Sequence, residues 1–74
     1  MVYAVHLRNG ETGENFVKRV EANNGFKAMR KAGVEYGNPL KWIASEPFNH
    51  ILGVATKIGA DTFTVPEWYG FQCK

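Results

Sequence analysis

The chain contains one segment with the apolar period of an α-helix, and segments of β-type alternation stand on both sides of it. Small and apolar residues recur there at i, i+3, i+7 and i+10, which is one stripe of a helix: Phe26, Met29, Gly33 and Tyr36. Asn23 or Asn24 can cap the start by accepting a hydrogen bond from a free backbone N–H. Gly37 suits the left-handed residue after a helix, and Pro39 prevents continuation. We therefore predict a helix over 24–36 whose stripe packs on a sheet.

The segment "VYAVHLR" alternates between two sets of side chains, as a half-buried strand does. Tyr3, Val5 and Leu7 point to one face, which places His6 on the other as a surface or rim residue. "NGETGE" then supplies glycines for a turn, and "NFVKRVEA" resumes an extended pattern. These two segments predict a β-hairpin.

Further strands are expected in the second half of the chain. "LKWIASEP" alternates with Leu40, Trp42 and Ala44 on one face, which predicts a strand with Trp42 in the core. "FNHILGVATKIG" fits either a helical stripe or the start of a hairpin, and the β-branched residues of "VATKI-GAD-TFTV" favour the hairpin. "EWYGFQCK" predicts a short closing strand.

These elements assemble into one α+β domain over residues 1–74, in the order ββαβββ. The sheet is expected to be mostly antiparallel, with the helix across one face. Ala28 and Ala32 flank the helical stripe, and their small size lets the helix lie close to the sheet. One helix cannot cover both faces, so we expect the second face to be open to water or to a partner.

Composition indicates a folded protein of the cytoplasm. The chain has 74 residues with 14% aromatics, which suits a small domain that depends on bulky side chains for its stability. The lone Cys73 cannot form an internal disulfide, which favours a reducing compartment. No basic-then-apolar leader opens the chain, and the longest uncharged run, 47–56, is too short to span a bilayer. We expect no membrane association.

Positive charge is concentrated in the first part of the chain. The net charge is +2, and seven of the nine Lys and Arg residues lie within the first 41 residues. Lys27, Arg30 and Lys31 fall on the polar side of the predicted helix, where they either contact an acidic partner or form an ordinary solvated surface. The predicted hairpin adds three more cations that could join them: Arg8, Lys18 and Arg19.

Aromatic residues cluster near the C-terminus. Trp68 and Tyr69 are adjacent, and neighbours on a strand point to opposite faces, so at least one of them is expected outside the core. Exposed Trp and Tyr are typical anchors of protein interfaces. We therefore predict a partner-binding patch at Trp68 and Tyr69, and we expect Trp42 and one of Trp68 and Phe71 to lie in the core.

The residue inventory argues against catalysis and metal binding. His6, His50 and Cys73 are widely separated and do not have the spacing of a zinc site. The acids are scattered, with no pair set for acid–base work. "NGETGEN" lacks the G-x-x-x-x-G-K-[ST] pattern of a phosphate loop and leads into a strand, so it is a turn. We expect no catalytic residue, no metal and no cofactor.

The order of the elements resembles that of small phage-encoded inhibitors, among them some anti-CRISPR proteins and phage inhibitors of bacterial RNA polymerase. The segments that carry the resemblance are "VYAVHLR", "NFVKRVEA", "NNGFKAMRKAGVEYG", "LKWIASEP" and a tail ending "WYGFQCK". The resemblance is one of layout and transfers no residue's role. It implies a non-enzymatic protein that binds one host machine in the host cytoplasm and blocks it. Unlike the acidic nucleic-acid mimics of that group this chain is basic, so it implies blocking of a protein surface or an acidic groove.

The leading hypothesis is a binding module that docks on a host protein or nucleoprotein complex through the basic helix face and exposed aromatics. The first alternative is direct nucleic-acid binding by the same basic face, although no RRM, KH, zinc-finger or helix-turn-helix signature is present. The second alternative is a homo-oligomerising module that pairs through an edge strand such as 62–66 or covers the open sheet face with a second copy. The oligomeric state is left open.

Overall fold

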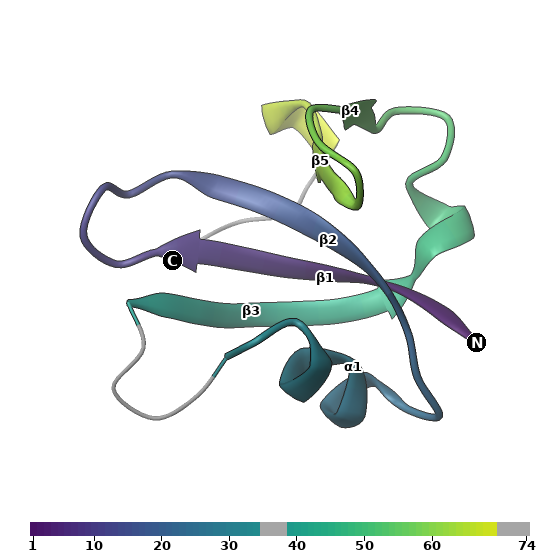
Figure 1. The fold of residues 1–74 in the computed structure, drawn as a ribbon. Coiled ribbons are helices and arrows are strands. Elements are labelled where there is room, and N and C mark those ends of the chain that lie inside the picture. The colour runs from purple at the N-terminus through teal and green to yellow at the C-terminus, as the bar shows by residue number, and fades with distance from the viewer. Residues whose placement is uncertain (35–38, 70–74) are drawn as a thin grey trace.

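The computed structural model describes residues 1–34 and 39–69, and it has the predicted α+β architecture (Figure 1). One helix lies against a five-stranded sheet whose strand order is β3-β1-β2-β5-β4, and every pairing in it is antiparallel. The elements are β1 (Val2–Asn9), β2 (Asn15–Glu21), α1 (Gly25–Lys31), β3 (Leu40–Pro47), β4 (Thr56–Lys57) and β5 (Thr62–Thr64), with two short 3-10 helices, η1 (Phe48–His50) and η2 (Glu67–Tyr69).

Strands β1 and β2 form the predicted hairpin. Their register runs from Val2 opposite Glu21 to Arg8 opposite Asn15. The side chain of Asn9 closes the turn, because its Oδ1 accepts the backbone N–H groups of the second and third residues after it, at 2.8 and 3.1 Å. The hairpin was predictable because its turn and its alternation are both local.

Helix α1 begins where predicted and ends earlier. Asn24 caps it, with Oδ1 accepting the backbone N–H of Lys27 at 2.8 Å. The helix ends before Gly33, which has φ +91°, so this glycine takes the left-handed position that was assigned to Gly37. Gly37 itself and Tyr36 lie outside the described residues.

The buried side of α1 also differs from the prediction. Ala28 and Ala32 are buried, whereas Phe26 is 57% exposed. A Cβ placed on Gly25 would lie only 3.2 Å from the Cβ of Ser45, so the helix approaches β3 too closely for a bulky side chain between them. The small flanking residues therefore form the contact, and the predicted apolar stripe is wrong at Phe26.

Replacing Gly33 by alanine should lower the free energy of unfolding by about 1–2 kcal/mol, because a Cβ is disfavoured at positive φ. Space is not the obstacle, since nothing lies within 4 Å of the Cβ position. Gly53→Ala is the matched control, because Gly53 also has free space but no positive φ. Urea denaturation checks this, and equal midpoints for the two variants would contradict it.

Strand β3 forms where it was predicted and pairs with β1, but a β-bulge changes the faces of its side chains. The register shifts between His6 and Leu7, so that Leu7 lies opposite Trp42 and His6 opposite Ala44. Trp42 and Ala44 therefore point to opposite faces, and Trp42 is 42% exposed instead of lying in the core. Its indole Nε1 donates a hydrogen bond to Ser45 Oγ at 2.9 Å.

The second face of the sheet is covered, which corrects the expectation that it is open. The chain after β3 folds back over this face through η1 and a turn, and the β4–β5 hairpin curls over beside them (Figure 1). Two cores result. The core on the helix side contains Val5, Leu7, Ala22, Ala28 and Ala32. The second core contains Ala4, Val17, Phe48 and Ile51.

The later segments are partly as predicted. The β4–β5 hairpin is confirmed by the pairing of Thr56 with Thr64 and of Lys57 with Phe63. Strand β5 also pairs with β2, so it is not the free edge that was expected at 62–66. The predicted closing strand is wrong for residues 67–69, which form η2, and Phe71 and Cys73 lie outside the described residues. Within the part of the chain that the structure describes, no helix has the length and apolar character needed to cross a membrane.

Candidate functional site

Helix α1 presents its three cations to solvent because its alanines face the sheet. Lys27, Arg30 and Lys31 are all exposed. Lys27 and Lys31 are four residues apart and share the side of the helix next to β2. The ammonium of Lys31 donates a hydrogen bond to the backbone oxygen of Glu21 at 2.9 Å, which ties this side of the helix to the end of β2.

Strand β2 adds two cations that lie on opposite faces of the sheet. Lys18 is opposite Val5 and therefore on the helix side, whereas Arg19 is opposite Ala4 and on the second face. The Arg19 guanidinium lies 3.6 Å from a carboxylate oxygen of Asp61 and 6.0 Å from the ring centroid of Phe48. Lys18 and Arg19 nevertheless border one depression together with Lys31. We therefore call this group of five cations the basic face: Lys18, Arg19, Lys27, Arg30 and Lys31.

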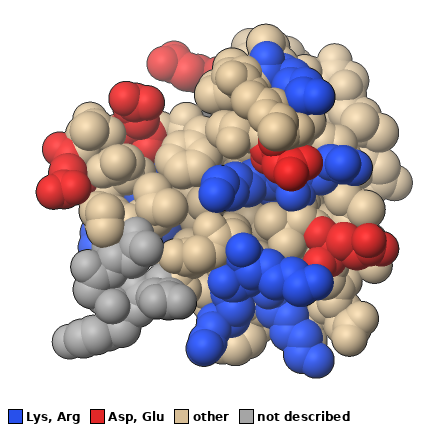
Figure 2. Space-filling model, viewed as in Figure 1, with Lys and Arg blue, Asp and Glu red and all other residues tan. Residues whose placement is uncertain are grey.

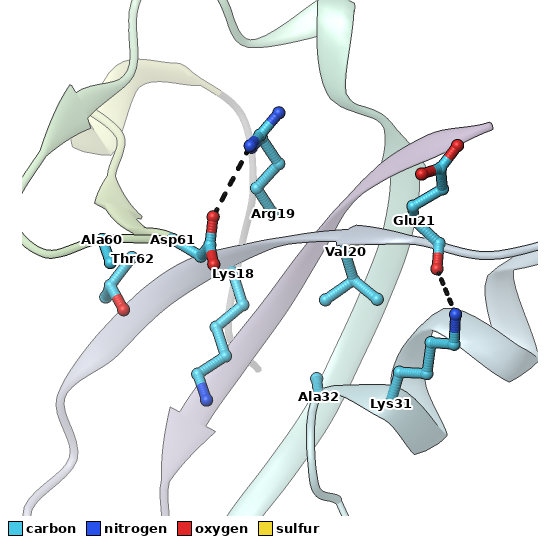
Figure 3. Close-up of a pocket in the computed structure, with 9 residues that line it drawn as sticks. All are labelled: Lys18, Arg19, Val20, Glu21, Lys31, Ala32, Ala60, Asp61 and Thr62. Carbon is cyan, nitrogen blue, oxygen red and sulfur yellow. Dashed lines mark hydrogen bonds and ion pairs between the residues drawn. The ribbon is translucent and has the colours of Figure 1, made fainter.

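A depression of about 600 Å³ lies between the end of α1 and the β4–β5 turn (Figure 3). Lys18 and Val20 project from β2 toward the same side as α1, and Lys31 closes the depression from the helix. The remaining lining residues are Arg19, Glu21, Ala32, Ala60, Asp61 and Thr62. A second depression, of about 290 Å³, lies on the other side of Lys31 and shares Glu21 with the first. We call them the large and the small depression.

Among the residues that the structure describes, the acids of this region, Glu21 and Asp61, do not place their carboxylates against the helix cations. Figure 3 shows the Glu21 carboxylate turned away from Lys31, which is bound to the backbone oxygen of Glu21 instead. Asp61 lies against Arg19 and not against the helix. Figure 2 shows the result as a group of Lys and Arg side chains over α1, with a second row above it in which an acidic side chain intervenes. Anions approaching α1 therefore meet a positive surface.

The other predicted site residues lie elsewhere. Arg8 is three residues beyond Val5 on β1 and on the opposite face from Lys18, near the hairpin turn. Trp68 is 73% exposed on η2, which Figure 1 shows on the far side of the sheet from α1. Exposure of Trp68 agrees with the prediction for one of the two adjacent aromatics. The structure does not bring Arg8 or Trp68 together with the helix cations.

Tyr69 belongs to a polar cluster that sequence reasoning missed. Its hydroxyl donates a hydrogen bond to Glu46 Oε1 at 2.8 Å, and the other carboxylate oxygen of Glu46 lies 2.7 Å from His6 Nε2. The Tyr69 and His6 rings are stacked, with centroids 6.4 Å apart. His50 Nδ1 lies 3.4 Å from the same Glu46 oxygen that Tyr69 contacts. Glu46 and His50 are four residues apart, but His6 and Tyr69 come from distant parts of the chain, so no local pattern indicates the whole cluster.

His6 is fully buried, which corrects its prediction as a surface or rim residue. Burial lowers the pKa of His6, although the hydrogen bond and the charge of Glu46 act in the opposite direction. The neutral ring donates its Nε2–H to the carboxylate, because a carboxylate can only accept. Burial and Glu46 together raise the pKa of Tyr69 to about 12. The cluster therefore joins β1, β3 and η2 by charge-assisted hydrogen bonds.

The cluster does not line either depression. Across residues 1–34 and 39–69, no group of three or more His, Cys, Asp or Glu side chains is placed to hold a metal ion. The basic face, with its two depressions, is accordingly the surface from which a function can best be argued.

Comparison with models of protein families, with curated proteins and with solved structures finds no match to this chain. A function is therefore inferred from the geometry of the basic face.

Proposed function

We propose that this chain is a non-catalytic binding module that docks through its basic face on an anionic surface of a partner protein or nucleoprotein complex. The observation that carries the proposal is the gathering of cations from two elements around the large and small depressions. A solvated helix would also expose Lys27, Arg30 and Lys31. Solvation of the helix alone gives no reason for a further cation, Lys18, on the neighbouring strand. It also gives no reason for the carboxylate of Glu21 to turn away from Lys31.

A blocking role in the cytoplasm is compatible with this proposal. The resemblance in layout to phage-encoded inhibitors suggests that the partner is a host machine, and a basic docking surface suits an acidic groove on such a machine. A single cysteine, at position 73, suits a reducing compartment. The lack of a catalytic role is proposed because His6 and Tyr69, which could move protons, are engaged with Glu46 inside the fold.

Reversing two charges of the basic face should weaken binding to an anionic probe by roughly ten- to a hundredfold, because each lost contact and each new repulsion costs about 0.2–1 kcal/mol. The variant is Lys27→Glu with Lys31→Glu. The probe is a labelled oligoglutamate peptide, and binding is followed by fluorescence anisotropy at stepped salt concentrations.

Lys41→Glu with Lys57→Glu is the matched control, because both lysines are exposed and line neither depression, and the net charge changes equally. Equal losses in the two double variants would show a net-charge effect and overturn the proposal for this face. A labelled mixed-sequence oligonucleotide is measured in parallel. If it binds more tightly than the peptide and with a steep salt dependence, the partner is a nucleic acid.

A further inference from the structure

An apolar hollow of about 420 Å³ lies at the edge of the second face, and none of the sequence patterns indicated it. Its walls are mainly apolar, and its lining residues are Met1, Val2, Arg19, Phe48, Asn49 and Leu52. Leu52 is 63% exposed, so a large apolar side chain stands in water beside the hollow. Exposed apolar side chains around a concave surface are typical of a binding site.

The fold produces the hollow by turning the chain sharply after η1. Phe48 and Ile51 pack into the second core, and the backbone N–H groups of residues 54 and 55 both bond to the oxygen of Ile51. This turn directs the next residue, Leu52, outward. Phe48 is held from below by an edge-to-face contact with Phe63, with ring centroids 5.1 Å apart. The hollow thus has a fixed floor and an exposed rim.

The hollow borders the basic face on two sides. Arg19 lines both the hollow and the large depression. Met1 lines both the hollow and the small depression, whose other lining residues include Lys27 and Lys31. A partner seated in the hollow therefore lies next to cations in two directions.

We propose that the partner is a protein segment that inserts one bulky apolar side chain into the hollow and places neighbouring carboxylates against Arg19, Lys27 and Lys31. This inference rests on the proposed function and specifies its partner. Charge complementarity argues for the acids, and the aliphatic rim of Met1 and Leu52 argues for the anchor. A nucleic acid would use the cations but leave the hollow empty, because Phe48 is buried and offers no open ring for base stacking.

The test is selection of a displayed random-peptide library against the immobilised full chain. Enriched peptides are expected to carry one bulky apolar residue flanked by Asp or Glu. One such peptide is then synthesised and measured against three variants. Leu52→Ser removes part of the rim and should weaken binding about tenfold or more, since an apolar anchor loses its contact. Asn49→Trp fills the hollow from its rim and should also weaken binding of the peptide about tenfold or more.

Ile58→Ser is the matched control, because Ile58 is 60% exposed and does not line the hollow. It should bind the peptide as the parent chain does. Circular dichroism confirms folding of each variant, and Asn49→Trp provides the test if Leu52→Ser is unfolded.

The outcomes separate this inference from the function on which it rests. Acidic peptides without an apolar preference, bound equally by the parent, Leu52→Ser and Asn49→Trp, would overturn the anchor and leave the basic-face function standing. Apolar peptides without acids, or no enrichment at all, would overturn both.

Discussion

Truncating Ile51 to alanine should lower the free energy of unfolding by about 2–5 kcal/mol, whereas the same type of truncation at the adjacent Leu52 should change it by less than about 0.5 kcal/mol. Ile51 is fully buried in the second core, so its loss leaves a cavity against Ala4, Val17 and Phe48. Leu52 is mostly exposed and loses little contact with protein. Urea denaturation followed by circular dichroism measures both variants.

This pair of variants tests the cover on the second face directly. A domain of this size has a total stability of roughly 5–10 kcal/mol, so the Ile51 variant should be visibly destabilised at room temperature. If Ile51→Ala were as mild as Leu52→Ala, the second face would not be a packed layer. The second face would then be open, as the sequence analysis predicts.

The fold class was predictable because its main elements depend on local patterns. The alternation of residues 2–8, the turn after them and the Asn24 cap are all short-range features, and each appears where it was predicted. The end of the helix was less certain because Gly33 and Gly37 are both suitable stops. The structure uses the earlier one, where the chain adopts φ +91°.

The errors concern features that depend on distant parts of the chain. The bulge in β3 shifts Trp42 relative to Ala44, and it is visible only once β3 is paired with β1. The cover on the second face comes from the segment after β3, whose apolar residues fit either a helical stripe or the start of a hairpin, whereas the structure forms η1 and a turn there. The alternation with Tyr3, Val5 and Leu7 predicts His6 at the surface or rim, but the cover on the second face buries it.

The candidate site was predictable only where it depends on a local pattern. The helical period assigns Lys27, Arg30 and Lys31 to the polar side of the helix, and all three are exposed in the structure. The hollow beside them could not be predicted, since its walls come from the N-terminus, β2 and the turn after η1. A hollow whose walls come from three separate segments leaves no recognisable pattern in the sequence of any one segment.

Removing the carboxylate of Glu46 should lower the free energy of unfolding by about 2–4 kcal/mol at neutral pH, because it removes the acceptor of the buried His6 ring and leaves the Tyr69 hydroxyl only its 3.3 Å contact with the backbone oxygen of His50. In Glu46→Ala the buried His6 Nε2–H and the Tyr69 hydroxyl each lose a hydrogen bond. Glu11→Ala is the control, since Glu11 is exposed in the β1–β2 turn. A cost no larger than that of the control would show that the cluster adds no stability.

The pH dependence of the parent chain gives the same cluster a second, independent readout. His6 has a folded pKa below 6.5, so on acidification through that value the unfolded chain binds the proton first and stability falls. Tyr69 has its pKa raised from 10.0 to about 12, so above pH 10 the unfolded chain loses the phenolic proton first and stability falls again. The contribution of Tyr69 to the free energy of unfolding is fully present below pH 10. Urea midpoints across this range should therefore show a plateau between these limits.

The Tyr69→Phe variant should lose most of the alkaline decline in stability and keep the acid decline, because its aromatic ring still covers His6. An unchanged alkaline decline in Tyr69→Phe would mean that another group causes it.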